Sequence, residues 1–325
     1  MTHLDWNRID PHVCGMLSLR QLEYLVAIAE TLHFRRAAER CNTTQPTLSG
    51  QLKALEDRLG ARLVERSRAK VILTPLGAEV AGIARRMLAD AQEIQTLTAS
   101  RGTELSGVMR LGLPPTVGPY LLPQVIPELH RTHPRLKLYV REELPGGLPT
   151  ALREGRYDLV MAPLPVRLRE LVVEPLFRER LYLAVAADHP LANRETVRRG
   201  DLRDEDILAL GAGHQLHDVV LAFCQDHGAR LRFDYEGTSL DTLREMVAMG
   251  LGLTFLPALY VRTVAARDDS IRTLELADRT LHRAVGLAWR RSSARQDSYR
   301  TLAGLLRGAL GKALPELEIL DGAGG

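Results

Sequence analysis

Apolar residues first recur at helical spacing directly after Ser18, which together with Gln21 forms the capping-box pattern of a helix start. Four positions make up this first apolar stripe: Leu19, Leu22, Val26 and Ala29. The short basic segment 34–40 predicts a second helix. The preceding residues 1–15 are polar and lack this periodicity, so Met16 is an alternative first residue of the protein.

A third helix is predicted after the turn-like stretch 41–44. Thr44 is its expected N-cap, Pro46 lies in the first turn, where proline is tolerated, and Gly60 ends it. The apolar positions of this helix are Leu48, Leu52, Leu55 and Leu59. Because they cover only one face, the opposite face is left to polar side chains.

Two short β-like runs, 61–65 and 71–74, flank the cationic segment 66–70, which is the expected tip of a hairpin. A long helix then opens at Pro75 with heptad-like spacing, which predicts that it pairs with a partner helix. Its apolar positions are Leu76, Val80, Ile83, Met87, Ile94 and Leu97. Three helices, a hairpin and a long helix are the order of a winged helix-turn-helix with a linker helix, and 100–106 is expected to be a connecting segment.

From Gly107 onward, short apolar runs alternate with helical patterns, which is typical of α/β units. The runs are 108–113, 136–140, 159–162, 181–186, 207–210, 253–256 and 284–289. The fold class predicted for the whole chain is therefore α+β multidomain. Residues 321–325 are expected to form a tail.

The 325 residues carry a formal net charge of only +3, which by itself does not indicate a nucleic-acid-binding protein. The charge is unevenly distributed, however. Residues 33–70 hold nine Lys or Arg against four Asp or Glu, a net charge of +5, whereas residues 71–325 are neutral. A basic segment attached to a neutral remainder is the distribution that DNA binding by the helix-turn-helix would need.

Cysteine usage and hydropathy exclude several protein classes. The three cysteines, Cys14, Cys41 and Cys224, are odd in number and form no Cys-x-x-Cys motif, which argues against a disulfide-rich secreted fold and a zinc ribbon. No apolar run is long enough to span a membrane, and no signal-peptide pattern occurs, so a cytoplasmic protein without membrane contact is expected. Without a nucleophile elbow, a P-loop or a dinucleotide motif, we expect neither an enzyme nor a cofactor.

The polar face of the third helix carries the candidate DNA-reading residues. Glutamine can form two hydrogen bonds with adenine, the threonine methyl group can contact thymine, and small side chains let the backbone approach a groove. Cations before the turn and on the hairpin suit phosphates, which position a protein without reading sequence. The candidates are Gln45, Pro46, Thr47, Ser49, Gly50 and Lys53 on the helix, Arg35 and Arg36 before the turn, and Arg66, Arg68 and Lys70 on the hairpin.

These segments resemble the LysR-type transcriptional regulators. The matching stretches are LRQLEYL at 19–25, AAER at 37–40, TTQPTLS at 43–49, LEDRLG at 55–60 and LTPLG at 73–77. Four further stretches resemble the peroxide-responsive OxyR branch of that family: HFRRAA at 33–38, QPTLSGQ at 45–51, PTVGPYLLP at 115–123 and TSLDTLR at 238–244. The resemblance extends from Met16 to about Leu310.

The resemblance implies a two-lobed sensor domain like that of periplasmic binding proteins, with two crossover strands. It also implies a homodimer or homotetramer, RNA polymerase as a further partner, and activation of transcription. The expected domains are a winged helix-turn-helix at 16–75, a dimerisation helix at 76–102 and an effector-sensing domain at 103–318. Lobe I is expected to comprise 103–178 and 284–318, and lobe II to comprise 179–283.

Hydroxyl side chains near expected helix N-termini are candidates for binding a polar effector. Thr116 follows the apolar run 108–113, and Thr238 and Ser239 precede a helix predicted at 240–249. The alternative is that each hydroxyl only caps its helix.

The chemistry of the sensor depends on the segment 211–224. In the OxyR branch, the resemblance implies a peroxidatic cysteine after a Gly-His pair and a resolving cysteine nine residues later. This chain has Gln215 at the first position and Cys224 at the second, with His217 in place of an arginine and Pro145 in place of a pocket threonine. An amide cannot become a sulfenic acid or form a disulfide, so the usual peroxide switch is not expected to operate.

Three alternatives therefore remain for this segment: a different small effector, a protein fixed in one state, or oxidation of Cys224 alone. Val220 and Phe223 on the same helix face predict that Cys224 is buried and inert. The spacing of the His, Asp and Cys side chains is too loose to predict a metal site. The expected effector-binding residues are Thr116, His214, Gln215, His217, Asp218, Thr238 and Ser239.

The function predicted from the sequence is that of a LysR-type, OxyR-like regulator, which binds promoter DNA and responds to a small effector rather than through a peroxide-formed disulfide. One alternative is a solute-binding or sequestering protein that uses only the two-lobed domain and needs neither a wing nor a heptad helix. The other alternative is a residual peroxide sensor that uses Cys224 alone.

Overall fold

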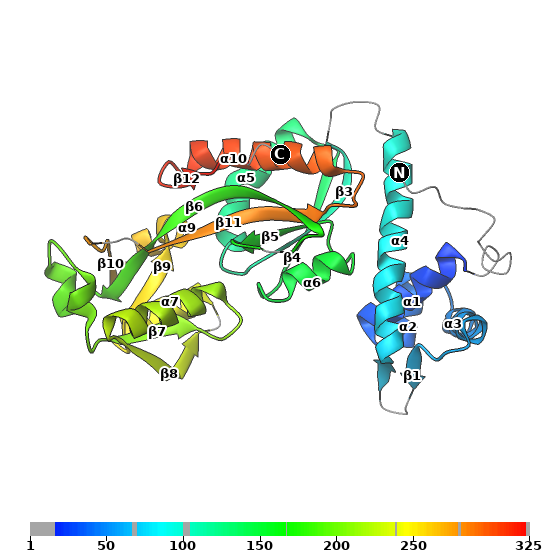
Figure 1. Cartoon of the computed structure of the whole chain (residues 1–325), viewed down its shortest axis with the longest axis horizontal. Coiled ribbons are helices and arrows are strands. Elements are labelled where there is room, and N and C mark those ends of the chain that lie inside the picture. The colour runs from blue at the N-terminus through cyan, green and yellow to red at the C-terminus, as the bar shows by residue number, and fades with distance from the viewer. Residues whose placement is uncertain are drawn as a thin grey trace. The chain divides into compact units, whose positions relative to one another are not determined.

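The computed structural model describes residues 17–66, 70–99, 105–166, 168–237, 239–278 and 281–322. Contacts within the chain divide it into an N-terminal unit and a larger C-terminal unit, with the boundary in the segment 100–104. Figure 1 shows the helices and strands of both units.

The N-terminal unit has the predicted order of helices and hairpin. Its elements are α1 (Leu19–Thr31), α2 (Phe34–Arg40), α3 (Gln45–Leu59), β1 (Val64–Arg66), β2 (Val71–Leu73) and α4 (Pro75–Ala99). Ser18 and Gln21 form the predicted capping box, the Thr44 hydroxyl accepts the N–H of Thr47, and Gly60 ends α3 with a φ of 64°. These predicted helix boundaries are confirmed.

The core of this unit forms where α1 and α2 pack on α3. Leu48, Leu52 and Leu55 are fully buried, together with Leu25 and Ile28 of α1. The fourth leucine of the predicted apolar face, Leu59, is not part of this core and is 39% exposed. Leu59 is the last residue of α3, so its side chain lies at the margin of this core.

The hairpin pairs β1 with β2 in antiparallel register, Val64 opposite Leu73 and Arg66 opposite Val71. The predicted first run, 61–65, begins too early. Glu56 Oε1 accepts the N–H of Leu63 at 2.8 Å and that of Val64 at 3.0 Å. This side chain of α3 therefore holds the segment that leads into β1. The hairpin tip at 67–69 lies outside the described residues.

The C-terminal unit contains an eight-stranded mixed sheet and a two-stranded parallel sheet. The main path of the large sheet is β10-β6-β11-β5-β3-β4, with β9 and β12 also paired to β6, and the small sheet is β7-β8. The strands are β3 (Gly107–Leu113), β4 (Leu136–Glu142), β5 (Leu159–Pro163), β6 (Leu171–Ala186), β7 (Asp206–Leu210), β8 (Arg230–Gly237), β9 (Thr254–Pro257), β10 (Ile271–Leu274), β11 (Leu281–Arg290) and β12 (Glu318–Ile319). The helices are α5 (Gly118–Thr132), α6 (Leu148–Arg153), α7 (Gln215–His227), α8 (Leu240–Ala248), α9 (Ala258–Thr263) and α10 (Gln296–Ala313), with short 3-10 turns η2 (Pro190–Asn193), η3 (Arg199–Leu202) and η4 (Ala265–Arg267).

Two long antiparallel strands, β6 and β11, connect the two lobes of this unit. They pair from Leu171 opposite Arg290 to Leu181 opposite Leu281. From Leu181 onward, β6 instead pairs with β9 and β10. The first lobe is therefore built on β3, β4 and β5, and the second on β7 to β10, which confirms the predicted two-lobed α/β architecture. The exact domain limits stay predictions.

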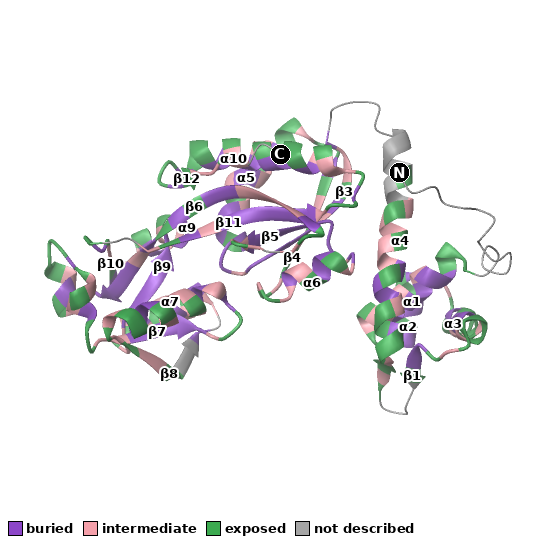
Figure 2. Cartoon of the chain, in the orientation of Figure 1, coloured by how far each residue is buried: buried purple, intermediate pink, exposed green. Residues whose placement is uncertain are grey.

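The largest fully buried side chains of this unit include Trp289, Tyr260, Tyr299, Phe177 and Phe255. Figure 2 shows that buried residues dominate β6 and β11, whereas the outward faces of α7 and α10 are exposed. Within the described ranges, no helix combines the length and the hydropathy that a membrane span requires.

Candidate DNA-binding surface and regulatory residues

The candidate DNA-reading residues lie on the first three turns of α3. Gln45, Pro46, Thr47, Gly50 and Lys53 are exposed, and Ser49 is half-buried. The Thr44 and Thr47 hydroxyl groups are 2.8 Å apart. The Thr47 hydroxyl group is thus engaged at the start of the helix, and the side chain as a whole remains exposed.

Gly50 lies in the middle of α3, where glycine destabilises a helix by about 1 kcal/mol relative to alanine. A Cβ atom built at Gly50 would meet no heavy atom within 4 Å outside its own helix backbone and chain neighbours. The packing of the N-terminal unit therefore does not require glycine at this position. The open space is available to a partner that approaches the helix closely.

The candidate phosphate-binding cations differ in their surroundings. Arg35 and Arg36 are exposed on α2, and Arg35 Nε lies 3.0 Å from Glu39 in a surface ion pair. Lys70 is also exposed. Arg68 and the side chain of Arg66 lie outside the described residues, so their predicted role is not addressed by the structure.

Hydrogen bonds and a backbone conformation that sequence reasoning missed support α3 and the turn that precedes it. Arg20 Nη2 donates a 2.6 Å hydrogen bond to the carbonyl oxygen of Cys41, and Asn42 adopts a φ of 50°, which asparagine tolerates well. Gln51 Oε1 accepts a 3.2 Å hydrogen bond from Gln21, which links α1 to α3. The turn-like composition of 41–44 was the only available signal.

One face of α4 is apolar and uncovered within the single chain. Leu76, Ile83, Met87 and Ile94 are 45%, 49%, 41% and 64% exposed, respectively. In contrast, Ala81 and Ala84 on the same helix are buried. Four of the six predicted stripe positions are therefore exposed, whereas Val80 is half-buried and packs against the core of the N-terminal unit, and the side chain of Leu97 lies outside the described residues.

Thr116 belongs to a buried polar network rather than to a helix cap. Arg283 donates to the Thr116 hydroxyl at 2.9 Å and to its carbonyl oxygen at 2.8 Å, while Arg283 Nε lies 2.7 Å from Glu179 Oε1. The N–H of Leu259 completes the network on Glu179 Oε2 at 2.8 Å. The expectation that Thr116 caps its helix is wrong, because the N-cap of α5 is Val117, which makes no side-chain cap bond.

The N-terminus of α7 brings His214 and Gln215 together. Gln215 Nε2 donates a 3.0 Å hydrogen bond to the carbonyl oxygen of Leu164 in the first lobe. Gln215 Oε1 and His214 Nδ1 are buried and have no hydrogen-bond partner among the described residues. Burial, together with the neighbouring His217, lowers the pKa of His214, so its imidazole is neutral at pH 7.

The other two predicted residues of this helix start have different surroundings. His217 Nδ1 lies 2.8 Å from the carbonyl oxygen of Leu210 and is therefore tied to the end of β7. Asp218 is exposed. The structure thus places His214 and Gln215 towards the interior of the unit and Asp218 at its surface.

Cys224 is 4% exposed, and burial raises the pKa of its thiol to about 11. At pH 7 the reactive thiolate is then only about one part in ten thousand. We expect peroxide to leave Cys224 unmodified in the folded protein, whereas urea makes it reactive. Mass spectrometry with iodoacetamide labelling measures this, and a disulfide between Cys224 and another cysteine in the folded state would contradict it.

Asp241 joins the two lobes through tyrosines that sequence reasoning missed. Tyr120 of α5 donates to Asp241 Oδ2 at 3.2 Å, and Tyr260 of α9 donates to Oδ1 at 3.0 Å. Burial and the adjacent carboxylate raise the pKa of both phenols, so both remain donors.

Ser239 caps α8 by accepting the N–H of Thr242, which is one of the two alternatives predicted for this hydroxyl group. Thr238 lies outside the described residues.

Two family models match this chain. Residues 19–78 match the bacterial regulatory helix-turn-helix protein, lysR family, and residues 102–311 match the LysR substrate binding domain. The chain belongs to the LysR family.

Of the described residues, no three His, Cys, Asp or Glu side chains are grouped so that they could hold a metal ion.

Known relatives place this LysR-type protein close to OxyR. It is 42% identical to the DNA-binding transcriptional dual regulator OxyR of Escherichia coli K12 over 291 residues, which cover 90% of this chain and 95% of that protein. A hydrogen peroxide-inducible genes activator of Pectobacterium carotovorum subsp. carotovorum is also 42% identical, over 90% of this chain and 96% of its own.

A solved structure agrees with these sequence relatives. A full-length cysteine-to-aspartate variant of OxyR from Pseudomonas aeruginosa matches with a TM-score of 0.76 at 37% identity, over 90% of this chain and 95% of that one. The expected resemblance to OxyR is confirmed, and the protein is a LysR-type DNA-binding transcriptional regulator. Members of the family are regulators rather than enzymes.

Proposed function

We propose that this LysR-type regulator reads promoter DNA with the first turns of α3 and responds to a small effector without a peroxide-formed disulfide. Gln215 is the observation that carries the second half of the proposal. Its amide is not redox-active, and it bonds Leu164 of the opposite lobe at 3.0 Å. The two cysteines in the described residues, Cys41 and Cys224, are buried and free.

DNA reading is assigned by side-chain chemistry. Gln45 bonds an adenine, the Thr47 methyl group contacts a thymine, and the small residues at 49 and 50 allow α3 to enter the major groove. Pro46 lies beside them on the exposed first turn. The phosphate-binding set is Lys53 on α3, Arg35 and Arg36 on α2, and Arg66, Arg68 and Lys70 on the hairpin.

A homodimer forms through the exposed stripe of α4 in this proposal, with a tetramer as the larger assembly of two such pairs. Heptad-spaced apolar residues on a solvent-facing helix are stabilised by packing against a second copy. A two-fold dimer then presents two copies of α3 to two half-sites of an operator.

The effector contacts His214 and Gln215 at the start of α7. Both have a buried atom without a partner, and each of these atoms can accept a hydrogen bond when His214 is neutral. A small molecule with hydroxyl or amine donors suits such atoms. His217, Asp218, Thr238 and Ser239 complete the effector set predicted from the sequence. Thr116 instead hydrogen-bonds Arg283.

In this proposal, bound effector shifts the two lobes relative to each other. The shift changes the placement of the subunits and so the DNA half-sites that they engage. RNA polymerase is recruited as a result. The relatives from Escherichia coli and Pectobacterium carotovorum are described as a dual regulator and an activator, which supports activation as the main mode.

Substitutions on α3 separate base reading from phosphate binding. Gln45→Ala is expected to relax sequence preference by about tenfold, because a bidentate base contact contributes about 1–3 kcal/mol of discrimination. Lys53→Gln is expected to weaken binding to specific DNA and to nonspecific DNA by the same factor. Fluorescence anisotropy with the protein's own upstream DNA and a scrambled duplex measures both, and identical behaviour of the two variants would refute the division of roles.

A further inference from the structure

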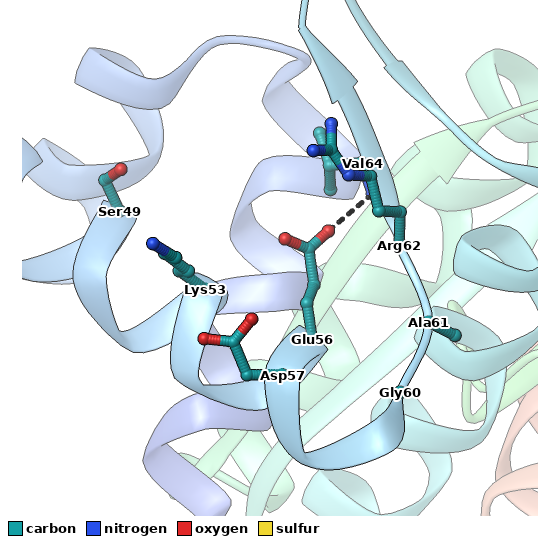
Figure 3. Close-up of a pocket in the computed structure, with 8 residues that line it drawn as sticks. All are labelled: Ser49, Lys53, Glu56, Asp57, Gly60, Ala61, Arg62 and Val64. Carbon is teal, nitrogen blue, oxygen red and sulfur yellow. Dashed lines mark hydrogen bonds between the residues drawn. The ribbon is translucent and has the colours of Figure 1, made fainter.

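A hollow of about 510 Å³ lies between α3 and the segment that leads into β1, the first strand of the hairpin or wing (Figure 3). Eight residues line it: Ser49, Lys53, Glu56, Asp57, Gly60, Ala61, Arg62 and Val64. Ser49 and Lys53 are the residues of this group that belong to the candidate DNA-reading face. The hollow therefore continues that face towards the base of the wing.

The hollow is flanked by cations from two different elements. Lys53 projects from α3 on one side, and Arg62 projects from the segment before β1 on the other (Figure 3). Both residues are exposed. Lys53 and Arg62 thus place one ammonium and one guanidinium group on two walls of the same hollow, with Glu56 between them in this view (Figure 3), and both kinds of cation bind phosphate groups.

The backbone that carries Arg62 is fixed by side chains on both sides of the hairpin. Glu56 Oε1 accepts the N–H groups of Leu63 and Val64, at 2.8 and 3.0 Å. Thr74 donates its hydroxyl to the carbonyl oxygen of Arg62 at 2.9 Å. Because its backbone is held in this way, Arg62 has less conformational freedom to lose when it binds a ligand.

Two acids also line the hollow, and they differ in their engagement. The carboxylate of Glu56 is half-buried and receives two backbone N–H groups, so its charge is partly compensated. Asp57 is exposed one residue later on α3. It is the acid that opposes an incoming phosphate and limits the affinity of the hollow for anions.

We propose that this hollow seats one backbone phosphate group of bound DNA, with Lys53 and Arg62 as its ligands and Glu56 as the positioning residue for Arg62. The inference rests on the proposed DNA binding and adds Arg62 to the phosphate-binding set. A phosphate held between α3 and the wing base fixes the angle at which α3 enters the groove.

The first test is the salt dependence of DNA binding by the full chain carrying Arg62→Gln. Each lost phosphate contact reduces the magnitude of the slope of log affinity against log salt by about 0.9. For a dimer, which loses two such contacts, the reduction is about 1.8. The matching loss of affinity is about fivefold per contact at 0.15 M salt. Arg131→Gln, which removes the same charge from an exposed site at the end of α5, is expected to keep the wild-type slope.

The positioning role of Glu56 is tested with a double-mutant cycle. Glu56→Ala removes both backbone hydrogen bonds and is expected to weaken DNA binding in the wild-type background but much less in the Arg62→Gln background. Glu56→Gln keeps an oxygen that accepts both N–H groups, so it is expected to retain the wild-type slope. Thermal unfolding of every variant separates misfolding from a lost contact.

The outcomes discriminate between the proposals. If Arg62→Gln lowers thermal stability but leaves the salt slope unchanged, Arg62 only balances the acids of α3, and the phosphate seat is refuted. If Glu56→Ala weakens binding equally in both backgrounds, Glu56 does not act through Arg62. If the wild-type chain itself shows no salt-dependent DNA binding, the proposed function fails instead.

Discussion

Replacing Arg283 with methionine is expected to lower the free energy of unfolding of the C-terminal unit by about 3–5 kcal/mol. The side chains of Arg283 and Glu179 are only 3% and 0% exposed. Without the guanidinium group, the Glu179 carboxylate would remain buried with the N–H of Leu259 as its remaining donor among the described residues, and Thr116 would lose two donors. An uncompensated buried charge of this kind is among the most destabilising changes in a folded protein.

The measurement is urea unfolding followed by the fluorescence of Trp289, which is fully buried in this unit. The matched control is Arg178→Gln on the same strand as Glu179. Arg178 pairs with Glu318, but the two side chains are 46% and 56% exposed, so the loss is expected to stay below about 1 kcal/mol. Equal losses in the two variants would contradict the assigned importance of the buried pair.

Replacing both Ile83 and Met87 of α4 with glutamate is expected to convert the proposed dimer into a monomer and to weaken operator binding by at least about a hundredfold. The two side chains are 49% and 41% exposed and lie on the apolar face of α4. Charges there cannot be buried against a second copy of the helix. The monomer then loses the effective concentration that a second half-site contact provides, which amounts to about 10²–10⁴ in avidity.

Analytical ultracentrifugation and anisotropy titration measure these two effects on the same samples. The control replaces Ile83 and Met87 with leucine, which keeps the face apolar and is expected to preserve both the dimer and the affinity. A glutamate variant that stays dimeric would show that α4 is not the dimerisation surface. A monomer that binds DNA with wild-type affinity would remove the link between dimerisation and recognition.

Features encoded by neighbouring residues were predictable from the sequence. The capping box of Ser18 and Gln21, the Thr44 cap and the Gly60 helix end each depend on residues within four positions of one another. The strands 108–113 and 159–162 were recognisable because buried strands are predominantly apolar, and only Arg110 interrupts these two runs. For the N-terminal unit, local patterns were therefore sufficient to predict the order of all elements.

Features encoded by distant residues were not predictable. The first half of β6 was missed because Glu174, Arg178 and Arg180 interrupt its apolar pattern, and these charges have partners far along the chain. Arg283 and Glu179 are separated by 104 positions, and Tyr120 and Asp241 by 121. Only the fold brings them together, so neither the role of Thr116 nor the tyrosine contacts at Asp241 was visible in the sequence.

The position of Arg62 illustrates the same limit within the N-terminal unit. The sequence predicts a strand over 61–65, in which Arg62 is an ordinary surface residue. Glu56 instead takes the N–H groups of Leu63 and Val64, and this places Arg62 at a hollow beside α3. Glu56, six residues before Arg62, thus determines the environment of Arg62. The number of charged residues in the segment 33–70 does not distinguish Arg62 from the other cations there.

We propose that this LysR-type protein recognises promoter DNA through its basic N-terminal unit and responds without a peroxide-formed disulfide. The most direct test is an anisotropy titration of its own upstream DNA and a scrambled duplex over a range of salt concentrations, with and without peroxide. We expect a linear fall of log affinity with log salt, a preference of at least about 10³ for the upstream DNA, and no change with peroxide. Equal affinity for both duplexes, or a peroxide response that requires Cys224, would contradict it.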